Sequence, residues 1–229
     1  MPIRAVIFDF NGVLVDDEHV HFALFREVLA DAGVDLDEET YHASYLGYDD
    51  RGCFTAALSD SGLDAPPGLI ADLIARKAAR YVEVAETELR FFRSADSSIT
   101  DLAATRPVAI CSGALRAEIE YALERLGVRP YVGSITSAED TSACKPDPEG
   151  YRVAFDRLRA LLHDLDPAEV LVIEDSLAGI QAARAAGMLP IGVSNTYAPT
   201  DLIQAGAIAV IMSLDILTSD WVDSLNDVM

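Results

Sequence analysis

The sequence predicts an α/β fold in which a parallel sheet carries helices on both faces and an all-helical domain is inserted near the N-terminus. Residues 5–8 form a short apolar run that ends at Asp9, and from residue 105 similar runs alternate with helical patterns. Residues 17–92, between them, show helical periodicity and no strand signal. Alternation of strands and helices is typical of right-handed crossovers and a buried parallel sheet, which we expect the first strand to join.

The elements of the α/β part follow from short apolar runs and from helical spacing. We expect strands at residues 5–8, 107–111, 131–136, 170–173, 190–193 and 207–212. We expect helices at residues 114–126, 148–162, 177–186 and 199–205. Gly127 and Gly187 directly follow two of these helices, as is typical of helix C-termini.

The helical block contains expected helices at residues 17–32, 38–46, 49–61 and 66–89. It leaves the α/β part near residue 16 and re-enters it near residue 92. We therefore expect one domain of residues 1–16 and 93–229 and a helical cap of residues 17–92. Two adjacent connections make a hinge, which suits a lid that closes on substrate, and a rigid second lobe is the alternative.

Composition limits the possible partners. The hydrophobic fraction of 51% indicates a globular chain, and 17 basic against 38 acidic residues give a net charge of −21. Such a surface repels nucleic acid, so we expect no nucleic-acid partner. It also repels a small anionic substrate, so each Lys or Arg near the expected site is informative.

The three cysteines, Cys53, Cys111 and Cys144, form no CxxC pair, which favours a reducing compartment. The first apolar run is too short for a signal peptide, and no later run is long enough to cross a bilayer. We therefore expect a cytoplasmic protein without a membrane partner, as a monomer or weak dimer.

Several strand-to-helix junctions carry side chains suited to phosphate chemistry: Asp9, Ser112 with Gly113, Lys145, and Glu174 with Asp175. Ligands of parallel α/β sheets bind outside the carboxyl ends of the strands, so we expect these groups to meet there. A carboxylate can attack phosphorus, and a nearby cation and hydrogen-bond donors offset the charge. Adjacent buried acids need a neutralising partner, and an all-oxygen set suits Mg²⁺. Taken singly, each group also fits a capping or solvated-turn role.

Four stretches resemble, in order, the motifs of the haloacid dehalogenase (HAD) superfamily, in its β-phosphoglucomutase and phosphoglycolate phosphatase branch. They are DFNGVLVD from Asp9, ICSGA from Ile110, CKPDPEGY from Cys144 and VIEDSLAGIQAARAAGMLPIGV from Val172. The resemblance implies a Rossmann-like catalytic domain under a helical cap, with hydrolysis of a small phosphorylated metabolite through an aspartyl-phosphate.

The resemblance also implies roles for individual residues. Asp9 is the nucleophile; Lys145 contacts both Asp9 and the phosphate, which Ser112 and Gly113 also bind. The implied Mg²⁺ ligands are Asp9, the backbone carbonyl of Asn11, Glu174 and Asp175.

Asn11 departs from the family pattern, in which an Asp protonates the leaving oxygen and then activates the hydrolytic water. An amide can do neither, and loss of a general acid–base costs about 10²–10⁴ in rate. The chain is then a slow phosphatase, a phosphatase with a base from elsewhere, or a binding or regulatory protein without efficient turnover. Asp17 and His21 are the candidate substitute bases, although a polar-face helix position also accounts for His21.

Other activities of the superfamily fit less well. Dehalogenases of the family need no metal and lack the paired acids, and phosphonate hydrolysis needs a Schiff-base lysine in the cap. Lys77 is the only lysine there, and by position Arg51 and Lys77 resemble the substrate-contacting residues of the sugar phosphomutases. Both also fit exposed helix cations. A phosphomutase therefore remains an alternative to a hydrolase.

Overall fold

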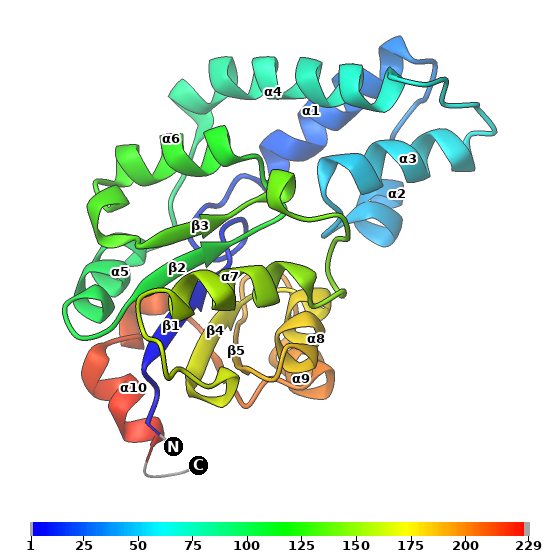
Figure 1. The fold of residues 1–229 in the computed structure, drawn as a ribbon. Helices are drawn as coiled ribbons and strands as arrows, with labels where there is room; N and C mark the ends of the chain where they lie inside the picture. The colour runs from blue at the N-terminus through cyan, green and yellow to red at the C-terminus, as the bar shows by residue number, and fades with distance from the viewer. Residues whose placement is uncertain (1, 227–229) are drawn as a thin grey trace. The chain divides into compact units, whose positions relative to one another are not determined.

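A computed structural model describes residues 2–226 and contains a six-stranded, all-parallel sheet (Figure 1). Its strands are β1 (Ala5–Phe8), β2 (Val108–Cys111), β3 (Ser134–Thr136), β4 (Val170–Glu174), β5 (Leu189–Val193) and β6 (Ala209–Ile211). Their order across the sheet is β3-β2-β1-β4-β5-β6. The predicted α/β fold is confirmed.

Strand β1 occupies the point where the strand order reverses. Ile7 pairs with Ala109 of β2 on one side and with Val172 of β4 on the other, and all three residues are fully buried. The carboxyl ends of β1, β2 and β4 are therefore neighbours. In open α/β sheets this position is the usual place for a ligand.

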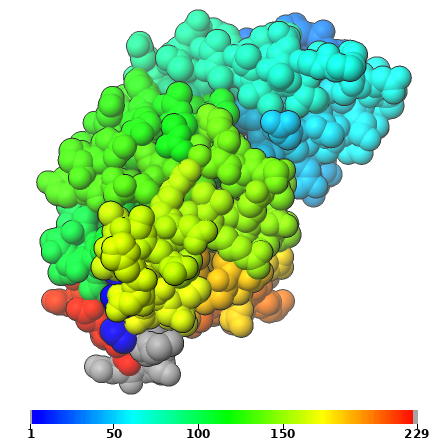
Figure 2. Space-filling model, viewed as in Figure 1, coloured from blue at the N-terminus to red at the C-terminus, as the bar shows by residue number. Residues whose placement is uncertain are grey.

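Helices cover the sheet on both faces. They are α5 (Ala95–Ala103), α6 (Arg116–Leu126), α7 (Glu149–Arg159), α8 (Leu177–Ala185), α9 (Pro199–Ala205) and α10 (Ser219–Leu225). Tyr151 and Leu158 of α7 and Ala182 of α8 pack on strand residues such as Ile7 and Val172. In the space-filling view of this face these helices hide most of β1 (Figure 2). Right-handed crossovers place α5 and α6 on the other face.

Two helices, α5 and α10, were not expected from the sequence, and the helix expected at residues 38–46 and the strand expected at residues 131–136 have other bounds. Helix α5 was not expected, although Ala95, Ile99 and Leu102 recur at helical spacing and all three are fully buried. The strand expected from residue 131 starts at Ser134, because Arg129–Tyr131 forms a 3₁₀ turn (η2) with Pro130 in its first turn. Further short 3₁₀ turns are η3 (Ala138–Asp140), η4 (Pro167–Glu169) and η5 (Leu214–Ile216).

The chain divides into two compact units, one that runs to Asp16 and resumes at Phe91, and one of Asp17–Arg90. The second unit contains α1 (Glu18–Asp31), α2 (Glu38–Thr40), a π-helical turn η1 (Tyr41–Tyr45), α3 (Asp50–Asp60) and α4 (Leu69–Glu88). Its core is built from the buried residues Phe25, Leu29, Phe54, Leu58 and Leu73, among others. The inserted part is all-helical, as expected, and its role as a cap stays a prediction.

Helices long and apolar enough to span a bilayer do not occur between residues 2 and 226.

Candidate active site

Asp9 lies directly beyond β1, at the carboxyl edge of the sheet. Its backbone N–H donates to the carbonyl of Ile173 at 2.9 Å, so the sheet ladder itself fixes the position of the residue. Only 6% of Asp9 is exposed. The β1 run therefore places a nearly buried carboxylate where the strand order reverses.

Lys145 brings a positive charge to Asp9 from the loop before α7. Its Nζ donates to Asp9 Oδ1 at 2.7 Å and to Glu174 Oε1. Burial alone would lower the pKa of Lys145, but the Asp9 and Glu174 carboxylates hold that pKa well above its usual value. Lys145 is therefore a permanent ammonium group between two acids.

The loop that carries Lys145 is shaped by the carboxylate of Glu149, in the first turn of α7. This carboxylate accepts hydrogen bonds from the backbone N–H groups of Ser142 at 2.9 Å and Ala143 at 2.8 Å. These bonds lower the pKa of Glu149 below its usual value. The bonds tie the chain just before Lys145 to the start of the helix that follows it.

Glu174, the last residue of β4, has both carboxylate oxygens engaged. Oε1 accepts from Lys145 and from the Tyr151 hydroxyl at 3.0 Å, and Oε2 accepts from the Ser176 N–H at 2.8 Å. A Cβ on Gly179 would lie 1.7 Å from Oε1, so the carboxylate rests directly on the glycine of α8. Glu174 is fully buried and firmly oriented.

Asp175 packs against the turn that follows Asp9. Gly12 in that turn has a φ of +76°, and a Cβ there would lie 2.0 Å from Asp175 Oδ2. The hydroxyl of Thr196 donates to the same oxygen. Burial and the nearby Glu174 and Asp9 charges raise the pKa of Asp175 well above its usual value.

Asp9, Glu174 and Asp175 form an acidic cluster whose ligand atoms all lie within 4.8 Å of one another. Burial raises the pKa of Asp9 to about 7, with Lys145 opposing the shift and Glu174 adding to it. One ammonium group faces three buried carboxylates, which leaves negative charge for a further cation to offset. Hard oxygen donors in this number fit a divalent metal ion.

Ser112 and Asn11 lie at the same edge. The Ser112 hydroxyl accepts from the Ala114 N–H at 3.1 Å and lies 3.4 Å from the side-chain oxygen of Asn11. Gly113, between Ser112 and Ala114 in the chain, is exposed, which leaves backbone near the start of α6 accessible to an anion. The structure thus gathers Asp9, Asn11, Ser112, Lys145, Glu174 and Asp175 around one edge of the sheet.

The sequence analysis missed three residues of this edge. Tyr151 contacts Glu174; Thr196 contacts Asp175; and the side-chain amide of Asn195 donates to the Gly12 carbonyl at 2.7 Å. Asn195 and Thr196 follow the expected strand at residues 190–193. The other site residues were selected because they follow expected strands. The same rule could therefore have found Asn195 and Thr196.

The second unit gathers five of its ionisable side chains into a largely buried network. Lys77 Nζ contacts Asp50 Oδ1 at 2.6 Å and His21 Nδ1 at 2.9 Å. Asp17 Oδ2 accepts from the Tyr81 hydroxyl at 2.6 Å and faces His21 Nε2 at 3.2 Å. Because an ammonium group only donates, Nδ1 accepts and the neutral ring carries its proton on Nε2. Both ring nitrogens of His21 are thus engaged.

The two cationic residues singled out from the sequence in this unit, Arg51 and Lys77, differ in exposure. Arg51 is exposed in the first turn of α3. Lys77 is fully buried inside the second unit, although the sequence also allowed an exposed helix cation there.

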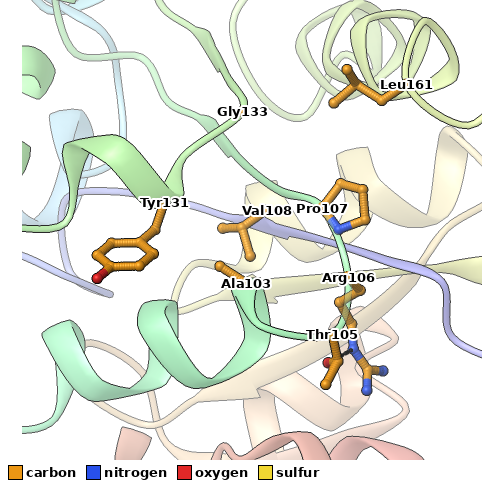
Figure 3. Close-up of a pocket in the computed structure, with 8 residues that line it drawn as sticks. All are labelled: Ala103, Thr105, Arg106, Pro107, Val108, Tyr131, Gly133 and Leu161. Atoms are coloured by element: carbon orange, nitrogen blue, oxygen red, sulfur yellow. Dashed lines mark hydrogen bonds between the residues drawn. The ribbon is translucent and has the colours of Figure 1, made fainter.

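A separate hollow of about 470 Å³ lies at the opposite end of the strands (Figure 3). Val108 begins β2 there, Pro107 precedes it, and Gly133 precedes β3. Its other lining residues are Ala103, Thr105, Arg106, Tyr131 and Leu161. The Arg106 guanidinium is already paired with Asp223. This hollow is not part of the acidic edge.

Fold and site together define an α/β protein with a lysine-bridged carboxylate cluster at the switch point of its parallel sheet. The family model described as haloacid dehalogenase-like hydrolase matches residues 3–187. The chain belongs to this family, and the family predicted from the four motifs is confirmed.

The chain is similar to two named phosphatases and to a solved structure that contains phosphate. The fructose-1-phosphate phosphatase YqaB of Escherichia coli is 28% identical and aligns over 82% of this chain and 95% of its own. A phosphorylated carbohydrates phosphatase of Thermotoga maritima is 27% identical over 94% and 97%. The crystal structure of CbbY from Rhodobacter sphaeroides in complex with phosphate matches with a TM-score of 0.83 and 26% identity, over 96% and 99%.

Proposed function

We propose that the chain is a Mg²⁺-dependent phosphatase that hydrolyses a small phosphorylated carbohydrate through an aspartyl-phosphate on Asp9. The observation that carries this proposal is the position of Lys145 Nζ, 2.7 Å from Asp9 Oδ1 and in contact with Glu174. A nucleophilic carboxylate is useful against a phosphate only where a fixed cation offsets the repulsion.

In the first step an Asp9 oxygen attacks phosphorus, the bond to the ester oxygen breaks, and the leaving oxygen takes its proton from solvent to depart as the alcohol. Lys145 offsets the charge of the nucleophile and of the phosphoryl group, and Ser112 with the Gly113 backbone binds phosphate oxygens. In the second step water attacks phosphorus, the bond between the Asp9 oxygen and phosphorus breaks, inorganic phosphate leaves, and the proton of the water passes to solvent. Asp9, the Asn11 carbonyl, Glu174 and Asp175 would hold Mg²⁺, which when bound would supply electrostatic neutralisation of the transferring group.

Asn11 slows both steps, because its amide neither protonates the leaving oxygen nor deprotonates the water. Asp17 and His21 remain the candidates for a substitute base. His21 accepts a hydrogen bond from Lys77 at Nδ1, so Nδ1 can take up a proton only after this hydrogen bond is broken. We therefore propose a slow enzyme whose phospho-enzyme persists.

The substrate class comes from the relatives. Their names specify fructose 1-phosphate and phosphorylated carbohydrates, and a variant of CbbY was crystallised with xylulose-(1,5)-bisphosphate. We propose that the all-helical unit acts as a cap that selects among such esters, with Arg51 on the substrate side. Lys77, buried in its network, would act there by holding His21 and Asp50.

The test is phosphate release from a panel of sugar phosphates, with and without Mg²⁺, by the native chain, Asp9→Asn and Asn11→Asp. We expect slow release by the native chain, none by Asp9→Asn, and a gain of about 10²-fold or more in Asn11→Asp. Intact mass must show that Asn11, which precedes a glycine, has not deamidated. Release that survives Asp9→Asn would contradict the nucleophile assignment.

A binding or regulatory role is the second candidate, and Asn11 is the observation that favours it. A native chain that binds a phosphate-mimicking fluoride complex but hydrolyses no ester would support this role. Conversion of a sugar phosphate to its isomer without phosphate release would instead indicate a phosphomutase.

A further inference from the structure

The connection between β5 and α9 contacts two different motifs of the site with two consecutive side chains. The Asn195 amide donates to the carbonyl of Gly12 at 2.7 Å, and the Thr196 hydroxyl donates to Asp175 Oδ2. Gly12 and Asp175 also touch each other, since a Cβ on Gly12 would lie 2.0 Å from that same oxygen. The β5–α9 connection therefore holds both Gly12 and Asp175, which contact each other.

The Thr196 bond restricts the Asp175 carboxylate. Asp175 is 5% exposed and lies among like charges. Without the Thr196 hydroxyl as donor, electrostatic repulsion would favour rotation of the Asp175 carboxylate away from Glu174 and Asp9. The hydrogen bond from the Thr196 hydroxyl to Oδ2 fixes the rotation of the Asp175 carboxylate, and Oδ1 takes no part in this bond. A β-branched side chain has few rotamers and serves well as such a fixed donor.

The Asn195 bond restricts the turn after Asp9. The Gly12 N–H donates to the carbonyl of Val15 at 2.8 Å, and its carbonyl is held by Asn195. The bond from the Gly12 N–H holds the peptide that joins Asn11 to Gly12, and with it the Asn11 carbonyl. The Asn195 bond holds the next peptide, from Gly12 to Val13, and so restrains the Asn11 carbonyl through Gly12. The β5–α9 connection is itself anchored, because the Ser194 N–H donates to the Ile211 carbonyl of β6 at 3.0 Å.

We propose that Asn195 and Thr196 are positioning residues that set the affinity of the acidic cluster for Mg²⁺. Thr196 acts through Asp175, and Asn195 acts through the turn that carries Asn11. The inference rests on the proposed function, because it requires that the cluster binds a divalent ion. Groups that orient metal ligands typically change metal affinity about 10–100-fold when they are removed.

The test is Mg²⁺ titration calorimetry on the full chain at constant pH and without substrate. Thr196→Val keeps the shape of the side chain and removes the donor, and we expect about 10–100-fold weaker binding. Thr196→Ser should restore most of the affinity. Thr200→Val is the matched control, since Thr200 is exposed in the first turn of α9 and its hydroxyl lies 3.4 Å from a carboxylate oxygen of its neighbour Asp201, away from the acidic cluster.

Both positions are exposed, so these changes open no cavity in the core. Asn195→Ala and Thr196→Ala provide independent variants if Thr196→Val misfolds, and each should also weaken binding. The proposal is overturned if the native chain binds Mg²⁺, Asp175→Asn abolishes binding, and the variants at 195 and 196 bind like the native chain; the proposed function then stands. A native chain that binds no Mg²⁺ would overturn both.

Discussion

Lys145 Nζ lies 2.7 Å from Asp9 Oδ1, although 136 positions separate the two residues in the sequence. The contact forms because β1 ends in Asp9 and the loop before α7 returns to the same edge of the sheet. It pairs the candidate nucleophile with one of the two lysines of the chain.

Loss of this ammonium group should affect chemistry most. We expect Lys145→Met to lower kcat/KM for phosphate release by about 10²–10³, because a fixed charge at the transferring group is removed. Arg93→Met is the control, since Arg93 is largely exposed. Equal kinetics in the two variants would show that Lys145 takes no part in the reaction.

Gly12 should be intolerant of any side chain. Gly12→Ala combines a φ of +76° with a collision at Asp175, whereas Gly62→Ala has a φ of +68° and nothing within 4 Å. We expect Gly62→Ala to cost about 1–2 kcal/mol of unfolding free energy from backbone strain alone. Gly12→Ala should cost more and also weaken Mg²⁺ binding. Denaturant unfolding and titration calorimetry measure the two effects, and matching losses in both variants would contradict the packing argument.

Asp140 should make stability depend on pH at the acid end. Arg157 and Ser137 hold the pKa of the Asp140 carboxyl well below its usual range, through bonds such as Arg157 Nη2 to Oδ1 at 2.7 Å. A lowered folded-state pKa stabilises the fold above the unfolded value of about 3.9, and the contribution is lost as pH falls below it.

We therefore expect Asp140→Asn to cost about 1–2 kcal/mol at pH 7 and progressively less below pH of about 4. Urea unfolding of both proteins from pH 7 to pH 3 measures the difference. A constant difference across this range would rule out the linkage.

Lys77 should contribute to the stability of the second unit through its ion pair with Asp50. Lys77→Met leaves the mostly buried Asp50 without its cation, and removing one member of a buried pair costs about 3–5 kcal/mol. The adjacent Arg76→Met is the control, because Arg76 and Asp31 are exposed and such pairs contribute about 0–1 kcal/mol. Adding Asp50→Asn to Lys77→Met should recover part of the loss. Thermal unfolding with equal losses at 76 and 77 would contradict the buried-pair account.

Several features could be predicted from the sequence because they depend on local patterns. The apolar runs of β1 and β4 end in Asp9 and in Glu174 with Asp175, and parallel strands share a carboxyl edge. That rule, together with the four motifs, was sufficient for the α/β fold and the family. Helix α5 was also within reach of such patterns, because Ala95, Ile99 and Leu102 recur at helical spacing.

What the sequence by itself determined is which side chains stand at strand ends, because alternation of apolar runs and turns encodes that directly. Tertiary structure decided their partners. Asn195 meets Gly12 across 183 positions because β5 lies beside β4 and β4 beside β1, an order that no local pattern contains. The burial of Lys77 likewise depends on helices that pack together around it, since a helical spacing alone fits an exposed cation equally well.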